Sequence, residues 1–123
     1  MELKNTKRMK SNNIQLIEIN CNNITDWKTF HDEFSKVFGF PDFYGRNMNA
    51  WNDCMSYLSD PEAQMTTIHC QNDNVITLEL KNIKNFKTRC PEQYNAIIEC
   101  SAFVNWRLIE DGDKPVLALS FYS

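Results

Sequence analysis

Glycine and proline are scarce in this chain of 123 residues, which has only three of the first and four of the second. Three isolated glycines cannot form a Gly-rich phosphate-binding loop, and so few breakers leave little room for a long flexible linker. The sequence also has no apolar run of the length needed to span a membrane. These absences exclude a common nucleotide-binding loop and argue against an integral membrane protein.

Cysteine is present, but it lacks the spacing of a metal site or of a disulfide framework. The five copies are odd in number and contain no C-x-x-C pair, so we expect reduced thiols in a cytoplasmic protein rather than disulfides. His69 and Cys70 are adjacent, and in a strand they would point to opposite faces and could not bind one ion together. His31 falls on the polar side of a predicted helix, where a solvated histidine is expected. We therefore expect no metal and no cofactor.

A catalytic set is also missing from the sequence. A cysteine nucleophile needs a partnered base, but Cys54 has only its neighbour Asp53 and falls toward the apolar side of its helix. We interpret Cys54 as a core-filling residue, with an RNA-related or thiol enzyme as the less favoured alternative. Carboxylate pairs such as Asp32 and Glu33 lie on predicted helix surfaces and do not converge as an acid and a base. The sequence favours a binding protein over an enzyme.

Charge is divided unevenly along the chain. Residues 1–13 carry a net charge of +3 and residues 14–123 carry −6, within a total of −3. An acidic body repels nucleic acid and favours a basic protein partner with salt-sensitive association. Segment 1–13 is polar and aperiodic, so we predict a disordered basic tail, with nucleic-acid binding through the tail as an alternative. No apolar stretch with a cleavage site follows it, which argues against a secretory signal.

Residues 14–123 are predicted to form a single α/β domain that is monomeric when free. Hydrophobic residues make up 42% of the chain, enough for a packed core. Strands separated by helices indicate parallel pairing with right-handed crossovers. We expect a three-layer sandwich in which helices pack on a three-stranded parallel sheet, with one added antiparallel strand contributed by a hairpin. The expected strands are 14–19, 65–70, 75–80 and 115–122. Strands 65–70 and 75–80 are expected to form the hairpin.

Residue types at helix ends set the expected helix boundaries. The expected starts are Thr25 or Asp26 as a cap, Asn47 as a cap and Pro91 in the first turn, and the expected ends are Gly39 and Gly112. A further short helix is expected at 82–88. The last strand is mostly apolar, which is typical of a central strand that is covered on both faces.

Residues 39–60 form the most informative segment, because a turn-rich loop leads into a short helix, 48–58, with two contrasting faces. The stripe that we expect to be buried comprises Met48, Trp51, Met55 and Leu58. The second stripe is small and polar with a single acid, and comprises Asn49, Asn52, Asp53 and Ser56. In the loop, Phe43 and Tyr44 are adjacent, and we expect one to be buried and the other exposed. This helix suits a surface that contacts another molecule.

Segment 38–60 resembles the barstar family of intracellular ribonuclease inhibitors. The likeness rests on Phe-Pro-Asp-Phe-Tyr-Gly-x-Asn at 40–47 and Trp-Asn-Asp-Cys-Met at 51–55. It covers 14–60 well and 75–122 more loosely, while 61–74 looks like an insertion. The resemblance implies a three-stranded parallel sheet packed by helices. It also implies that loop 40–47 and helix 48–58 occlude the active site of a ribonuclease or ribonuclease-like toxin, as an immunity protein does, with Asp53 in place of a substrate phosphate.

The same resemblance, extended to the polar face, implies a set of partner-binding residues. This set is Phe43, Tyr44, Gly45, Asn47, Asn49, Asn52, Asp53 and Ser56. The chain departs from the family where Asn49 replaces an aspartate, Asn52 a tryptophan and Arg46 a glutamate. Because these changes lower the negative charge, we expect weaker steering and a less basic partner, or poor binding to the usual enzyme.

Each of these residues also has a purely structural interpretation. Asp53 can be an ordinary exposed acid, Asn47 only a cap, and Gly45 only a residue with positive φ. The alternative function is that of a barstar-fold interaction module with a non-ribonuclease partner.

Overall fold

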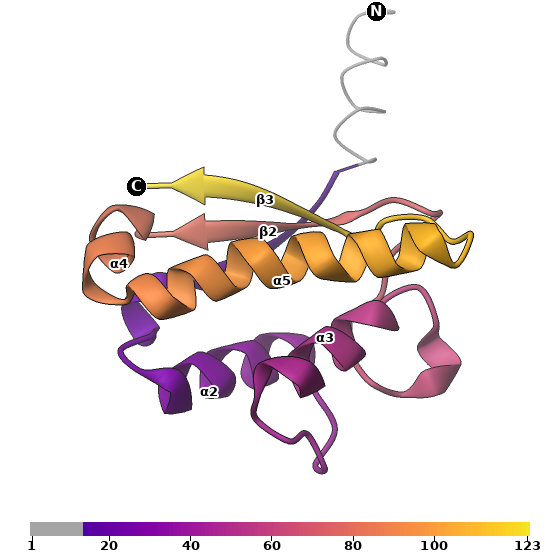
Figure 1. Cartoon of the computed structure of the whole chain (residues 1–123), viewed down its shortest axis with the longest axis horizontal. Helices are drawn as coiled ribbons and strands as arrows, with labels where there is room; N and C mark the ends of the chain where they lie inside the picture. The colour runs from indigo at the N-terminus through magenta and orange to yellow at the C-terminus, as the bar shows by residue number, and fades with distance from the viewer. Residues whose placement is uncertain (1–13) are drawn as a thin grey trace, which may run out of the picture.

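The structure, a computed structural model, describes residues 14–123, so the predicted basic tail at 1–13 lies outside the described residues. Strands β1 (Gln15–Asn20), β2 (Ile76–Lys81) and β3 (Leu117–Tyr122) form a parallel sheet in the order β1-β2-β3, of which Figure 1 labels β2 and β3. In the register of this sheet, Ile17 lies opposite Leu78 and Leu78 opposite Leu119. The predicted mixed α/β fold with a three-stranded parallel sheet is confirmed.

Among residues 14–123 the structure has four helices, α2 (Trp27–Phe38), α3 (Met48–Ser56), α4 (Ile83–Arg89) and α5 (Pro91–Glu110). The 3₁₀ turn η1 (Cys21–Asn23) lies between β1 and α2, and η2 (Pro61–Ala63) lies between α3 and β2. In Figure 1 the strands, then α5, then α2 and α3 follow one another from top to bottom. Helix α5 therefore links the sheet to α3, because it packs against both β3 and α3. No helix among residues 14–123 is long and apolar enough to cross a membrane.

The core is rich in aromatic side chains, and it fixes α3 in place. Phe30, Phe34 and Phe38 of α2 are fully buried, as is Trp51 of α3. The rings of Phe34 and Trp51 meet edge to face with centroids 5.5 Å apart. Burial of each such side chain contributes about 1.5–3 kcal/mol. The apolar stripe of α3 thus anchors the helix in the core and fixes the position of its opposite face.

Most of the expected helix ends are confirmed. Asp26 caps α2 by accepting a hydrogen bond from the Thr29 amide at 2.8 Å. Gly39 ends α2 with a φ of 64°, and a Cβ there would come within 2.2 Å of the Thr67 hydroxyl. Pro91 stands in the first turn of α5. Helix α3 ends at Ser56, two residues before the predicted end.

The predicted hairpin is wrong, because residues 65–70 form no strand. The Thr67 amide donates to the Phe38 carbonyl at 2.8 Å, and the Cys70 amide donates to the Leu58 carbonyl at 2.9 Å. These residues therefore use their backbone groups to close the ends of α2 and the turn after α3. No added antiparallel strand is found among residues 14–123.

The predicted central position of the last strand is also wrong. β2 occupies the centre and β3 lies at an edge. The side chains of Ile76, Leu78 and Leu80 alternate with half-buried ones along β2, whereas Phe121 and Tyr122 at the end of β3 are exposed. Apolar content alone did not reveal that this strand has a partner on one side only.

Candidate binding surface

Loop 40–47 is held from beneath by a buried hydrogen bond. The Tyr44 hydroxyl lies 2.6 Å from Nδ1 of His31 on α2, and both side chains are buried. Burial raises the pKa of the Tyr44 phenol and lowers the pKa of His31, so at neutral pH the hydrogen bond joins a protonated phenol to a neutral imidazole. The prediction that His31 is solvated is wrong, since it is only 3% exposed. The loop folds back over the side of α2 that the helical pattern marked as polar.

The two adjacent aromatics of the loop divide as predicted. Tyr44 is buried against Phe40, with ring centroids 4.6 Å apart, whereas Phe43 is 76% exposed. An exposed phenylalanine on an anchored loop is a common kind of interface residue, because its position is already fixed before a partner arrives. Tyr44, by contrast, supports the loop from inside.

Arg46 and Gly45 complete the turn in an unexpected way. The positive φ of this turn belongs to Arg46, at 56°, and not to Gly45. Arg46 Nη2 donates to Asp32 Oδ1 at 2.7 Å and to the Lys28 carbonyl at 3.0 Å. The guanidinium and Lys28 lower the pKa of the Asp32 carboxyl. Gly45 is exposed, so its missing side chain leaves bare backbone on the surface.

Asn47 joins the loop to α3. Its Oδ1 accepts a hydrogen bond from the Ala50 amide at 2.8 Å, which is the predicted N-terminal cap. Asn49, in the first turn of α3, is exposed. Gly45, Asn47 and Asn49 thus lie exposed along one continuous stretch of chain.

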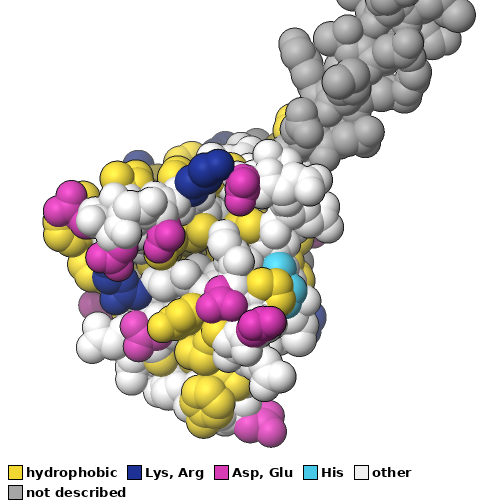
Figure 2. Space-filling model, turned by 90° about the vertical axis from the view of Figure 1, so that its right-hand side faces the viewer, with side chains coloured by type: hydrophobic (Ala, Val, Ile, Leu, Met, Phe, Trp, Pro, Cys, Tyr) yellow, Lys and Arg dark blue, Asp and Glu magenta, His cyan; other side chains and the backbone are white. Residues whose placement is uncertain are grey.

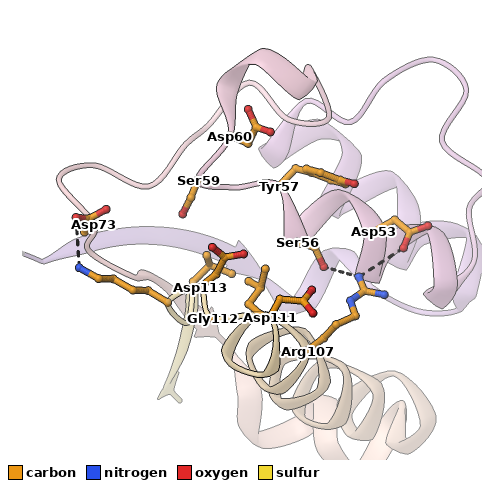
Figure 3. A pocket seen from close by; sticks show the side chains of 13 residues that line it. Asp53, Ser56, Tyr57, Ser59, Asp60, Asp73, Arg107, Asp111, Gly112 and Asp113 are labelled. Atoms are coloured by element: carbon orange, nitrogen blue, oxygen red, sulfur yellow. Dashed lines mark hydrogen bonds and ion pairs between the residues drawn. The ribbon is translucent and has the colours of Figure 1, made fainter.

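Asp53 points outward from α3 and is the only acid of that helix. Its side chain is 61% exposed, and Oδ1 lies 3.5 Å from Nη2 of Arg107 on α5. The same nitrogen donates to the Asn52 carbonyl at 3.3 Å and to the Ser56 hydroxyl. Figure 3 shows Arg107 reaching from α5 to both Ser56 and Asp53. The carboxylate is therefore accessible, but it is accompanied by a cation of the same chain.

Asn52 belongs to the polar stripe that we expected to face a partner, but the structure buries it. It is 8% exposed, and its Oδ1 is buried with no hydrogen-bond partner among the described residues. The closeness of α3 and α5 covers this position, which the sequence of α3 alone could not show. Ser56 is half-buried and donates to the Asn52 carbonyl at 2.7 Å. Part of the predicted polar face is used for helix packing.

Cys54 is 1% exposed, which agrees with a core-filling residue. Burial raises the pKa of its thiol to about 11, with a smaller contribution from Asp53. A thiol of this kind stays protonated near neutral pH and is a poor nucleophile. Among residues 14–123 there is also no cluster of three or more side chains placed to hold a metal ion.

A depression of about 640 Å³ opens beside Asp53, between the ends of α3 and α5. Seven of its lining side chains carry charge, namely Asp53, Asp60, Asp73, Asp111, Asp113, Arg107 and Lys114. Lys114 lies 3.4 Å from Asp73, so both cations are paired with aspartates. Figure 2, seen from this end of the molecule, shows more acidic than basic side chains. The surface around Asp53 is therefore acidic even though α3 has a single acid.

Sequence reasoning missed the roles of Arg107 and His31 and the four other aspartates that share the depression with Asp53. A signal existed for His31, because Trp27, His31, Phe34 and Phe38 recur at helical spacing. No comparable signal existed for Arg107, which is 54 residues away from Asp53 and meets it only through the packing of α5 on α3.

Comparison with known families gives one finding for this chain. A family model described as Barstar (barnase inhibitor) matches residues 14–120. The match covers the loop, α3, α5 and the segment 61–74 that joins α3 to β2. A search of curated proteins gives no match.

Proposed function

Because the chain belongs to the barstar family, we propose that it inhibits a ribonuclease or ribonuclease-like toxin by covering the active site of that enzyme. In this proposal loop 40–47 and α3 form the contact surface, and Asp53 takes the place of a substrate phosphate. The protein acts as a monomeric immunity protein in the cytoplasm, with no direct contact to nucleic acid. It supplies no catalytic group.

The position of Asp53 is the observation that carries this proposal. Its carboxylate is exposed on a short helix whose opposite side is held by the buried Trp51 and Met55. An anion fixed in this way makes charge-assisted hydrogen bonds to the arginines and lysines of a phosphate-binding site without paying to become ordered. It cannot be cleaved, so it blocks the site.

The surroundings of Asp53 support a basic partner. The depression beside it has five aspartates, Asp53 included, against Arg107 and Lys114. An acidic area of this kind speeds association with a cationic active site and makes that association sensitive to salt. The exposed Phe43 and the bare backbone of Gly45 lie on the same loop, where they are placed to pack against the partner.

Titration of ribonuclease activity tests the proposal. Barnase and a panel of small secreted ribonucleases are each assayed on an RNA substrate with increasing amounts of the wild-type chain, Asp53→Asn or Glu18→Gln. Glu18 is an exposed acid on β1, so Glu18→Gln removes one negative charge outside the proposed contact surface. We expect stoichiometric inhibition of at least one ribonuclease by the wild type and by Glu18→Gln.

Asp53→Asn should weaken that inhibition by about 2–5 kcal/mol, because it leaves the partner's cations unpaired in the interface. Equal inhibition by Asp53→Asn and the wild type would show that the assigned mechanism is wrong. Failure of the wild type to inhibit any ribonuclease of the panel would favour an interaction module with a different partner.

A further inference from the structure

A cation of the chain itself already lies beside Asp53. Arg107 Nη2 approaches Asp53 Oδ1 at 3.5 Å, but it makes closer contacts to the Ser56 hydroxyl and the Asn52 carbonyl. The guanidinium also lies over the ring of Phe103, 5.3 Å from its centroid. The contact with Asp53 is therefore the longest of these three polar contacts, and the others hold Arg107 beside α3 without it.

This arrangement has a consequence for any partner of Asp53. The Arg107 side chain is 36% exposed and is held to α3 by its contacts with Asn52 and Ser56, so these contacts oppose its movement away from the carboxylate. A dense group of cations would then face a like charge next to the anion that attracts them, and like-charge contacts are a common way of rejecting a wrong partner.

We propose that Arg107 determines which basic partner the Asp53 surface prefers: it disfavours a site whose cations all crowd around Asp53, and it favours one in which a carboxylate accompanies the cation that binds Asp53. This inference rests on the proposed function for the identity of the surface. All the hydrogen bonds of the Arg107 side chain to residues 14–123 come from Nη2, and none comes from Nε or Nη1. Because an arginine offers five N–H donors in a planar fork, these free groups suit a carboxylate placed beside the cation that binds Asp53.

The first test uses barnase as the nuclease and isothermal titration calorimetry at low salt. The full chain is compared as wild type, Arg107→Gln, Arg107→Lys and Lys84→Gln. Lys84→Gln is the matched control, since it removes one positive charge from an exposed site on α4. We expect Arg107→Gln to bind about threefold to tenfold more tightly than Lys84→Gln, the range given by Coulomb interaction at these separations.

Two further variants separate the charge effect from a structural one. Arg107→Lys keeps the charge and should stay within about twofold of the wild type. Adding Asp53→Asn to Arg107→Gln should abolish the gain, because the competition is for that carboxylate. Circular dichroism and the melting temperature of each variant show that the fold is retained. A gain that persists without Asp53, equal binding by Arg107→Gln and Lys84→Gln, or weaker binding by Arg107→Gln would overturn the proposal.

A second test does not depend on any ribonuclease. Chemical-shift titration gives the Kd of each variant for two peptides, hexa-arginine and an alternating (Arg-Glu)₃. The ratio of the hexa-arginine Kd to the (Arg-Glu)₃ Kd should fall about threefold to tenfold in Arg107→Gln relative to Lys84→Gln. An unchanged ratio contradicts the role of Arg107. A changed ratio in a chain that inhibits no ribonuclease supports the role of Arg107 and counts against the proposed function alone.

Discussion

Loop 40–47 and the polar face of α3 are neighbours in the proposed contact surface, yet they are held in opposite ways. The loop is fixed by a buried contact of Tyr44 with His31 and by a partly exposed ion pair of Arg46 with Asp32, and it leaves Phe43 and Gly45 exposed. The polar face of α3 is fixed from the side, by Arg107, which contacts the same groups that we expected a partner to contact.

The difference separates shape from charge. The loop keeps its shape through contacts within the chain, so in the proposed complex its contribution is a preformed surface. The charge of α3 is shared with α5, so its contribution depends on how a partner balances Asp53 against Arg107. In the proposed complex, recognition would combine a preformed apolar part with an ionic part that depends on the charges of the partner.

Trp51→Ala should give the largest effect, because it removes the buried support of α3. Large-to-small substitutions of fully buried aromatics destabilise by about 3–5 kcal/mol, and Trp51 is completely buried against Phe34. Urea unfolding followed by circular dichroism measures the free energy of unfolding. A fall in the free energy of unfolding of less than about 1 kcal/mol would contradict the view that Trp51 anchors the helix that carries Asp53.

Tyr44→Phe should have the next largest effect, because it leaves His31 without its hydrogen-bond partner in a buried site. An unsatisfied buried polar group costs about 1–3 kcal/mol. The free energy of unfolding should fall by this amount, and amide exchange should rise in residues 40–47. A double variant that carries both Tyr44→Phe and His31→Gln should lose less stability than the sum of the losses in the two single variants, which would confirm the coupling. Independent, additive effects would break the proposed link.

Acid should destabilise the fold through His31. Burial, with a further contribution from Arg46, holds its pKa below the usual 6.5, against a smaller opposing effect of Asp32. The unfolded chain therefore binds more protons than the folded one below pH 6.5, so stability is full above pH 6.5 and declines as the pH falls below it. Unfolding measured from pH 7.5 to 5 should show this decline in the wild type, and His31→Gln should flatten it. Parallel curves for the two proteins would assign the decline to other groups.

Phe43→Ala should have the smallest effect on stability and a clear effect on binding. The side chain is mostly exposed, and such substitutions change the free energy of unfolding by about 0.5 kcal/mol or less. Aromatic contact residues in interfaces often cost more than 1 kcal/mol of binding energy when truncated. Comparison of the melting temperature with the inhibition constant separates the two. An unchanged inhibition constant would remove Phe43 from the contact surface.

The sequence predicts well the fold class and the local features that position the candidate surface. Local signals with a single physical cause gave the caps at Asp26 and Asn47, the end of α2 at Gly39 and the buried stripe through Trp51. The division of Phe43 and Tyr44 into exposed and buried was also confirmed.

What the sequence missed depends on contacts between distant segments. The alternating pattern at 65–70 is that of a strand, but these residues bond to the ends of other elements. The apolar run of β3 gives no information on its neighbours in the sheet. The burial of Asn52 and the pairing of Arg107 with Asp53 both arise where α5 crosses α3. Helical spacing within α3 cannot contain that information.

Amide hydrogen exchange on the complex tests the central claim most directly. The chain is compared alone and in an equimolar mixture with a ribonuclease that it inhibits. We predict that added protection is concentrated in residues 40–56, which comprise the loop and α3, and that α4 at 83–89 is unchanged. Protection confined to the strands or to α4, with residues 40–56 exchanging as in the free chain, would contradict the assignment of this surface as the site that covers the enzyme.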